Sequence, residues 1–294
     1  MILREDVAGT CMDGIRLLGT ALLQFCKEYG DNVKLVIYKS DISHAYQNFW
    51  VHPLWQIKQI ISVGTEWYVN WCNCFGGHAC YLIFLSFTLL LAWMAQEVKL
   101  IKNLRMYIDD NRSFTCIGDI TYYPPYDSYY PSDQVKLLLL WDELNIPCVK
   151  KKQIYRPIIP YVGFNVNPNT MTILLSDDRW SELIAKVHNF SRIGKCHLLL
   201  EYQRLAGHVN WSLPVWPLLH PCLSAMYAKI AEKTKLFAGI WVNKVVETEL
   251  AWFVKHVSSS SGVFLLRSVT WDPNIASYDS TVCYTDACLM GMAY

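Results

Sequence analysis

Residues 105–114, RMYIDDNRSF, place two carboxylates, Asp109 and Asp110, directly after a short apolar run and directly before polar residues. Neighbouring carboxylates repel each other, so such a pair is tolerable where solvent surrounds it or where a cation neutralises it. Asp and Asn also favour tight turns for purely local reasons. Taken alone, the pair fits a solvated turn better than a functional site. A further carboxylate at the end of another buried strand would favour the functional site.

A third carboxylate lies in such a setting earlier in the chain. Residues 33–38, VKLVIY, have the composition of a buried strand, and Asp41 comes shortly after them. Folding alone gives no reason for a charge where a buried strand ends, unless the strand ends at a site. If this strand and the one before Asp109 are neighbours in one sheet, the carboxylates come close together, and we predict a divalent-metal site there.

Hard cations such as magnesium bind carboxylate oxygens and keep coordination positions for water and for substrate phosphates. Two such ions stabilise both the attacking and the leaving oxygen of an in-line phosphoryl displacement. Asp41, Asp109 and Asp110 are therefore our candidate catalytic residues and metal ligands. The expected cofactors are two Mg²⁺ ions, with Mn²⁺ as an alternative.

Composition indicates a folded protein without a strongly charged surface. Of the 294 residues, 53% are hydrophobic and 17% are charged, which is typical of a chain with a real core. The net charge is only +1, so a nucleic-acid site would have to be a local basic surface. The 11 cysteines are scattered and we find no signal peptide, which favours an intracellular, reduced and non-secreted protein.

Two segments suggest alternatives that we consider weaker. Cys72, Cys74, His78 and Cys80 are possible zinc ligands, but their spacing lacks the loop that a tetrahedral site needs. The uncharged apolar run 80–95 is shorter than the ~20 residues of a membrane span, so we predict a core helix there and no membrane contact.

The order of predicted elements indicates an α+β fold. Residues 104–110 and 112–118 are predicted to pair as a hairpin across Asp110 and Asn111, and residues 117–133 to form a loop before a helix. The other predicted helices cover 12–30, 80–95, 134–145, 176–191, 198–213, 221–237 and 243–258, and the other predicted strands cover 33–38, 64–71, two segments around the turn 167–170, 262–269 and 280–294.

Six segments then resemble, in order and approximate spacing, the reverse transcriptases of retrotransposons, most of all those of fungal elements. They are KSDISHAYQNFWVHPLWQIKQI (39–60), CFGGHA (74–79), MYIDDNRSF (106–114), CVKKKQIYRPIIPYVGF (148–164), QRLAGHVNW (203–211) and VCYTDACLMGMAY (282–294). The resemblance implies a right-hand polymerase palm, an antiparallel sheet with helices on one face, at 34–175. It also implies a remnant of the fingers at 1–33, a helical thumb and connection at 176–262, and the truncated start of a ribonuclease H-like domain at 263–294.

The resemblance assigns roles to individual residues at the metal site. Asp41 and Asp109 would bridge both metal ions, Asp110 would support one of them, and the carbonyl of Ile42 would complete a metal shell. Tyr46 matches an aromatic steric gate that lies under the sugar of the incoming nucleotide and rejects a 2′-hydroxyl, because a rigid ring packed there overlaps with that hydroxyl.

Further residues follow from the same resemblance. Phe75, Gly76 and Gly77 would lie beside the nascent base pair, where glycine lets the backbone approach closely. His78, Ala79 and Cys80 depart from the small or hydroxyl residues usual there. Lys151 or Lys152 would protonate the leaving pyrophosphate, and a basic run of this kind is otherwise a solvated or phosphate-contacting surface.

The implied partners are an RNA or DNA template-primer duplex and deoxynucleoside triphosphates. The predicted thumb would contact phosphates through Arg179, Lys186, Arg192, Lys195 and Arg204, whereas Trp211 and Trp216 are expected in the core. Asp286 would be the first acid of a ribonuclease H site whose other acids are absent, so no RNA cleavage is expected. Arg4 is a candidate remnant of the basic clamp that the fingers provide.

The function predicted from the sequence is therefore reverse transcription by a fragment of a retrotransposon polyprotein. The alternative is an impaired or decayed polymerase fragment that at most binds nucleic acid. A charge clamp supplies much of the transition-state stabilisation in phosphoryl transfer, so incomplete fingers would lower the rate strongly.

Overall fold

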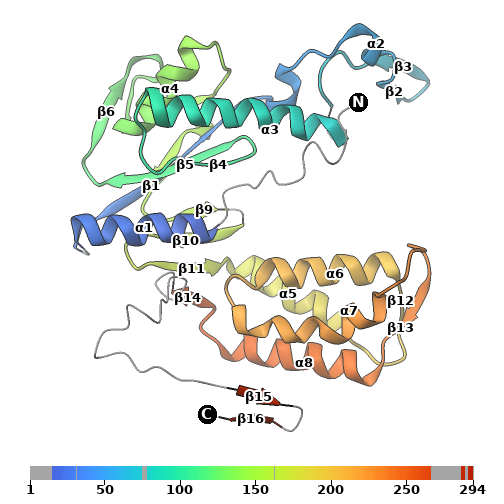
Figure 1. Cartoon of the computed structure of the whole chain (residues 1–294). Coiled ribbons are helices and arrows are strands. Elements are labelled where there is room, and N and C mark those ends of the chain that lie inside the picture. The colour runs from blue at the N-terminus through green and yellow to red at the C-terminus, as the bar shows by residue number, and fades with distance from the viewer. Residues whose placement is uncertain are drawn as a thin grey trace.

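A four-stranded antiparallel sheet lies at the centre of the N-terminal half of the molecule (Figure 1). The computed structural model describes residues 15–30, 32–74, 78–161, 163–265, 286–288 and 291–293. In the order in which they pair, the strands of this sheet are β4 (Arg105–Tyr107), β5 (Asp110–Cys116), β1 (Leu35–Asp41) and β8 (Ile154–Arg156). The strand predicted at 33–38 is thus confirmed, in the middle of the sheet.

Helices lie against both faces of this sheet. Ile37 and Phe114 are paired across β1 and β5, and they belong to the same core cluster as Leu18 and Leu22 of α1 (Ile15–Tyr29). Gln134 of α4 (Ser132–Glu143) instead donates to the hydroxyl of Ser40 at 3.1 Å. Residues 37 and 40 of one strand point to opposite faces. The expectation of helices on one face only is therefore wrong.

The apolar run forms α3 (His78–Trp93), which continues as a π-helix, Met94–Val98. One face of α3 is buried through Phe84 and Leu91, whereas Leu90 and Trp93 are exposed. By length and composition alone, the described stretch Cys80–Val98 could span a membrane, with a mean hydropathy of 1.6 and 28% of its window buried. The prediction of a core helix therefore holds for one face, and a packed helix of a soluble protein passes the same test.

Two hairpins were not predicted. Residues 117–133 were expected to form a loop, but β6 (Ile120–Tyr123) and β7 (Ser128–Pro131) pair there, with Tyr122 opposite Tyr129. Cross-strand tyrosines stabilise such a pair, which outweighs the turn propensity of its Pro and Asp residues. The second hairpin joins β2 (Ile60–Val63), which was not predicted, to β3 (Glu66–Val69), which confirms the strand predicted at 64–71. It lies beside the short helix α2 (Pro53–Gln56).

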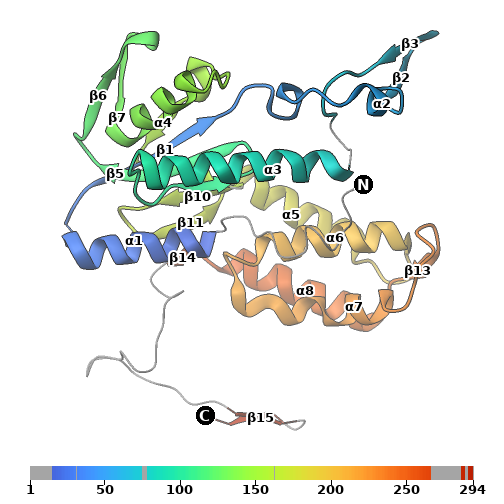
Figure 2. The same ribbon diagram turned by 45° about the horizontal axis from the view of Figure 1, so that its top comes forward.

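A second antiparallel sheet links this half to a group of helices (Figure 2). Its order is β14-β11-β10-β9, and the turn predicted at 167–170 joins two of its strands. The strands are β9 (Ile159–Tyr161), β10 (Phe164–Asn167), β11 (Thr172–Leu175) and β14 (Val263–Leu265). The boundary predicted at 263, between the thumb and connection and the ribonuclease H-like segment, therefore falls at the start of β14, which pairs with β11 in this sheet.

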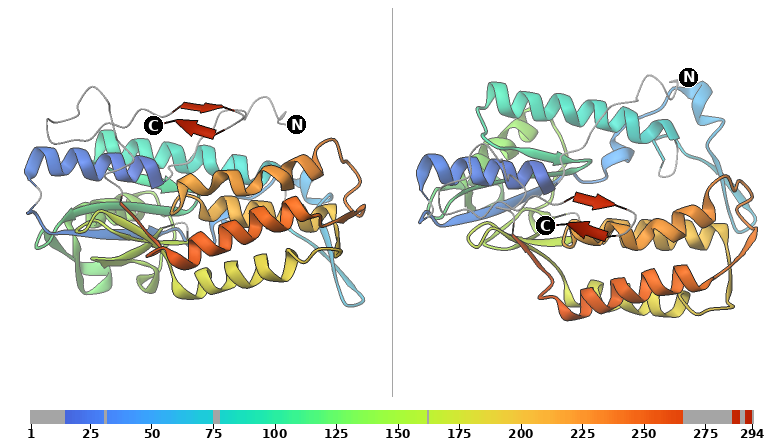
Figure 3. Two further views of the ribbon diagram at one scale, coloured as in Figure 1. Left: turned by 90° about the horizontal axis from the view of Figure 1, so that it is seen from below. Right: turned by 60° about the horizontal axis from the view of Figure 1, so that its bottom comes forward.

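The C-terminal helices pack on one another, with α5 against α6 and α8 (Figure 3). These helices are α5 (Asp177–Phe190), α6 (Leu199–Ser212), α7 (Ser224–Ile230) and α8 (Lys244–Ser259). The helices predicted at 176–191, 198–213 and 243–258 are confirmed, and the one at 221–237 is shortened. A two-stranded pair, β12 (Cys196–Leu198) with β13 (Gly239–Trp241), closes the far end, and β15 (Asp286–Cys288) pairs with β16 (Gly291–Ala293).

Gly163 allows the second sheet to approach α6 closely. Its φ is +88°, and a Cβ built there would lie 2.5 Å from Cζ2 of Trp211, whose ring stacks on Phe164 with centroids 4.8 Å apart. A methyl group would therefore displace an indole that is already packed.

Gly163→Ala is expected to lower the free energy of unfolding by about 1–3 kcal/mol more than Gly118→Ala does. Gly118 has a similar φ of +94° but no atom within 4 Å of the added Cβ, so it controls for backbone strain. Urea unfolding of both variants measures the difference, and equal losses would contradict a steric role for Trp211.

Candidate active site

The register of β1 on β5 brings the three predicted acids together. Asp41 is directly opposite Asp110 at the end of the strand pair, and the backbone N–H of Ile42 donates to the carbonyl of Asp109 at 3.4 Å. The β4–β5 hairpin turns at Ile108 and Asp109, between the paired residues Tyr107 and Asp110. The turn predicted at 110–111 thus lies two residues earlier, which places Asp110 within the strand and Asp109 in the turn.

Ile108 adopts a left-handed backbone conformation in this turn, with φ of +58°. A β-branched residue is strained there, because its Cβ crowds the backbone, and glycine is the usual choice at this place in a tight hairpin. The Ile108 side chain packs against the core cluster that contains Phe84 and Ile42. The strained turn is therefore held by side-chain packing, and it fixes where the carboxylate of Asp109 lies.

Three cationic side chains contact the two strand acids. Nζ of Lys152 lies 2.5 Å from Oδ1 of Asp41, and Nζ of Lys39 lies 2.5 Å from Oδ1 of Asp110. Arg112 donates through one terminal nitrogen to Oδ2 of Asp110 at 2.6 Å. These cations offset the repulsion between the two neighbouring carboxylates.

Asp109 has no ion pair among the residues that the structure describes, and its environment disfavours its charge. Burial raises the pKa of its carboxyl above the usual value, and the neighbouring charges of Asp41 and Asp110 raise it further. Asp41 and Asp110 are thus close enough to Asp109 to repel its charge, and a cation bound among the three carboxylates would reduce this repulsion.

The donor set suits magnesium or manganese in chemistry, but it is not a preformed cage. In the described part of the chain, no group of three or more His, Cys, Asp or Glu side chains is placed to hold a metal ion. The carboxylates of Asp41 and Asp110 instead point to ammonium and guanidinium groups. Metal binding here requires local rearrangement of side chains, and it stays a prediction.

The predicted nucleotide-binding residues lie partly at this site. Tyr46 is in the 3-10 helix Ala45–Asn48 that follows β1, and its ring packs edge-on against Phe84 with centroids 5.1 Å apart. Burial, and then the charge of Asp109, raise the pKa of its hydroxyl, so Tyr46 and Asp109 are neighbours. Ile42 is buried beside the strand end.

Several predicted residues lie outside this geometry. Phe75, Gly76 and Gly77 fall outside the described residues, as does Arg4. Asp286 begins β15 at the far end of the chain. The side chain of His78, one of the four possible zinc ligands, also lies outside the described part of the structure.

The structure separates the three consecutive lysines. Lys152 is bound to Asp41, Nζ of Lys150 donates to the carbonyl of Tyr126 at 2.6 Å, and Lys151 is exposed. Lys152 is thus the lysine that lies at the acids, a choice that the sequence left open. Interaction with Asp41 raises its pKa, so it carries a proton at neutral pH.

Three residues of this site were missed by sequence reasoning: Lys39, Arg112 and Gln153. The amide of Gln153 is buried and donates to the backbone carbonyl of Asp41 at 3.3 Å. Alternation along β1 would have found Lys39, which shares a face with Asp41 two residues later. Arg112 follows from the same alternation along β5, two residues after Asp110, whereas Gln153 is found only once the tertiary structure is known.

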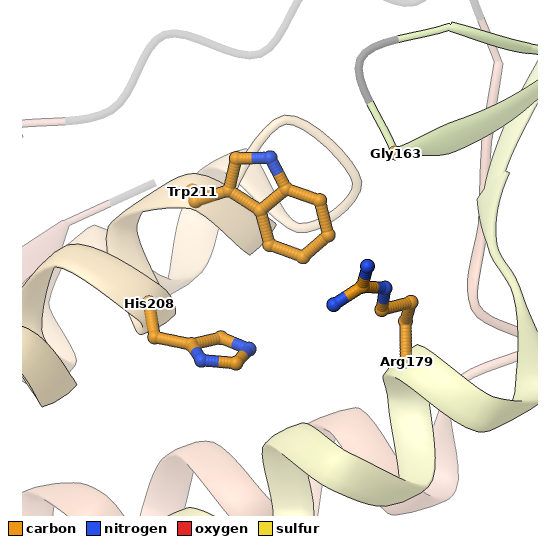
Figure 4. A pocket seen from close by; sticks show the side chains of 4 residues that line it. All are labelled: Gly163, Arg179, His208 and Trp211. Carbon is orange, nitrogen blue, oxygen red and sulfur yellow. The ribbon is translucent and has the colours of Figure 1, made fainter. Parts of the chain in front are cut away.

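Near the helices, Gly163, Arg179, His208 and Trp211 line a cavity of about 430 Å³ (Figure 4). Trp211 was expected in the core but is only partly buried here, whereas Trp216 is buried and donates to Ser260 at 2.8 Å. Lys186 pairs with Glu182 at 2.7 Å and lies 3.1 Å from the ring of His208. Glu182 pairs with both Arg179 and Lys186, and burial, followed by the positive charge of Lys186, lowers the pKa of the His208 ring.

Comparison with solved structures identifies the architecture. Three structures of the foamy viral protease-reverse transcriptase match with a TM-score of 0.52 each: the dRH form with ds DNA, the enzyme with an RNA/DNA hybrid, and the enzyme with dsDNA. The fold resembles that of a reverse transcriptase. In the same order, identity is 16%, 14% and 15%, and the match covers 76%, 86% and 86% of this chain.

At this level of identity, the likeness concerns the fold. The match covers 35%, 30% and 46% of the foamy viral chains, so this chain spans less than half of their length. No protein-family profile and no curated protein matches the sequence. The resemblance to fungal elements therefore rests on the sequence motifs alone.

Asp109→Asn is expected to stabilise the metal-free protein, by roughly 2 °C in Tm at neutral pH. A carboxyl whose pKa is raised on folding destabilises the fold once it ionises, so the gain appears as pH rises through the folded-state pKa and vanishes below the unfolded-state pKa of about 4.

Asp41→Asn is the matched comparison, because it removes a charge that Lys152 balances and is expected to lower Tm. Thermal unfolding of both variants between pH 3 and roughly pH 8 measures the effect. A lower Tm for Asp109→Asn at neutral pH would contradict the electrostatic reasoning.

Proposed function

We propose that this chain is the polymerase core of a reverse transcriptase, which transfers a nucleotide to the 3′-hydroxyl of a primer. The observation that carries this proposal is the pairing of Asp41 with Asp110 at the end of β1 and β5, with Asp109 in the adjacent turn. A reverse transcriptase-like fold supports it, because the acids are at a strand end and a hairpin turn of the same sheet. The three acids together with a reverse transcriptase-like fold support a polymerase function more strongly than the acids or the fold alone.

Asp41, Asp109 and Asp110 would hold two Mg²⁺ or Mn²⁺ ions, with the carbonyl of Ile42 nearby. When bound, these ions would neutralise charge on the triphosphate and activate the primer hydroxyl. The chain's own part is to present three carboxylates on rigid backbone: a strand pair for Asp41 and Asp110, and a packed turn for Asp109. Phosphoryl transfer depends on positioning and charge stabilisation more than on covalent protein chemistry.

Lys152 is the candidate general acid for the leaving pyrophosphate. Its ammonium group is protonated, it lies against Asp41, and its side chain is 42% exposed, so it can leave the carboxylate for a phosphate. Lys151, the other candidate, has no described contact to the acids and is a phosphate-contacting residue in this proposal.

The proposed partners are an RNA or DNA template-primer duplex and deoxynucleoside triphosphates. The foamy viral enzymes in the matching structures are bound to dsDNA or to an RNA/DNA hybrid. In this chain the basic residues of α5, α6 and the segment between them, with the cavity at Trp211, would form a surface for the duplex backbone. Arg179 and Lys186 are the residues of that surface that line or adjoin the cavity.

The second candidate function is a polymerase-like fragment that binds nucleic acid without extending a primer. One observation favours it: the ammonium groups of Lys39 and Lys152 lie against the carboxylates that would bind metal. A primer-extension experiment distinguishes the two functions.

Purified protein with a primed RNA template, deoxynucleotides and Mg²⁺ or Mn²⁺ is expected to extend the primer. Asp41→Asn and Asp109→Asn should each lower the rate by at least about a hundredfold, because each removes a charge from the metal ligands. Glu247→Gln on α8 is a matched control and should leave the rate unchanged. Template binding without extension under either metal would favour the binding-only function.

Tyr46→Val is expected to let the enzyme accept ribonucleotides. Removing the ring opens space beside the sugar, so the preference for deoxynucleotides should fall by roughly tenfold or more, with deoxynucleotide incorporation largely retained. Single-nucleotide incorporation with each triphosphate measures the ratio. Phe49→Val, which removes another ring packed on Phe84, is the control, and an equal change in both variants would contradict a steric gate at Tyr46.

A further inference from the structure

Cationic side chains of the protein surround the carboxylates of Asp41 and Asp110. Oδ1 of Asp41 contacts Lys152, and Oδ2 of Asp41 lies 3.9 Å from Nζ of Lys39. Oδ1 of Asp110 lies 2.5 Å from the same Nζ, and Oδ2 of Asp110 accepts from Arg112. Every carboxylate oxygen of the two strand acids therefore faces a cation of the protein itself.

Lys39 differs from the other two cations in its position. It is two residues before Asp41 on β1 and therefore on the same face, and Asp110 is directly across from Asp41. Its ammonium group is consequently the one that reaches both acids. Of the two strand acids, Lys152 contacts Asp41 and Arg112 contacts Asp110.

Arg112 is a permanent partner of Asp110. Its side chain is 5% exposed, and its guanidinium lies over the ring of Tyr161, 4.7 Å from the centroid. Lys39 is directly opposite Arg112 in the strand pair, and like charges in that position repel unless a carboxylate lies between them. Asp110 is that carboxylate, and the pairing keeps the Lys39 ammonium at the acids.

We propose that Lys39 is a resident counter-ion, whose ammonium group occupies the region between Asp41 and Asp110 and competes there with a divalent cation. The inference rests on the proposed function, in which these acids bind metal. In the free protein, Lys39 lets two carboxylates lie side by side without a metal. Its flexible stem, 23% exposed, lets the ammonium move aside, whereas the packed Arg112 stays.

Divalent-cation affinity of the free protein tests this inference without a need for catalysis. Mn²⁺ titrated into wild type and into Lys39→Met, with free ion followed by electron paramagnetic resonance, gives both dissociation constants. Removing a positive charge about 4 Å from the binding position should tighten Mn²⁺ binding by roughly tenfold or more. Lys39→Arg keeps the charge and should bind within about threefold of wild type.

Lys136→Met is the matched control, because it removes an ammonium 2.6 Å from a carboxylate, Asp133, on α4. It should leave Mn²⁺ affinity unchanged. If Lys39→Met does not fold, Lys39→Gln serves as the neutral variant, because glutamine is uncharged but still polar. Unchanged or weaker Mn²⁺ binding by the neutral Lys39 variants would overturn the inference.

The same titration separates this inference from the proposed function. Asp41→Asn should abolish Mn²⁺ binding in both the wild-type and the Lys39→Met backgrounds. Binding by wild type that is lost in Asp41→Asn, but insensitive to residue 39, would refute the counter-ion and leave the metal site standing. No binding by any variant would overturn both.

Discussion

The antiparallel register that pairs Asp41 with Asp110 is the constraint on which the rest of the site depends. A shift of one residue would turn Asp41 to the other face of β1, since side chains alternate along a strand. The register is specified by burial: Ile37 and Phe114 are paired on the face that packs under α1. A hydrophobic pair four residues away thus determines where the carboxylates meet.

Bringing like charges together at a strand end has an electrostatic cost, and the chain offsets it with its own cations. Lys39, Arg112 and Lys152 come from β1, β5 and the short helix before β8, so each of three neighbouring segments contributes one. Asp109 has no ion pair among the described residues, and burial, followed by the charges of Asp41 and Asp110, raises the pKa of its carboxyl. The three cations balance the three acids in formal charge, so a divalent cation would bind more favourably once a mobile ammonium group such as that of Lys39 moves aside.

The two sheets are coupled through the same interactions. Tyr161 belongs to β9 of the second sheet, and its ring supports the guanidinium that binds Asp110. Phe164 and Gly163, a few residues later, pack against Trp211 of α6. Tyr161 and Phe164 are opposite each other in β9 and β10, so the second sheet contacts both the guanidinium at the acids and the indole beside α6.

The candidate acids, the helices around them and the strand that carries Asp41 could be predicted from the sequence, because hydrophobic periodicity and the Tyr-x-Asp-Asp motif are local signals. Sequence reasoning misplaced the hairpin turn at Asp109 and missed the β6–β7 pair, since cross-strand packing overrides turn propensity. Two contacts could be known only from the three-dimensional arrangement: Lys152, rather than Lys151, lies at Asp41, and Lys39 of β1 reaches Asp110 of β5. Ion pairs between strands depend on register and on side-chain reach, neither of which is encoded in the spacing of residues along one segment.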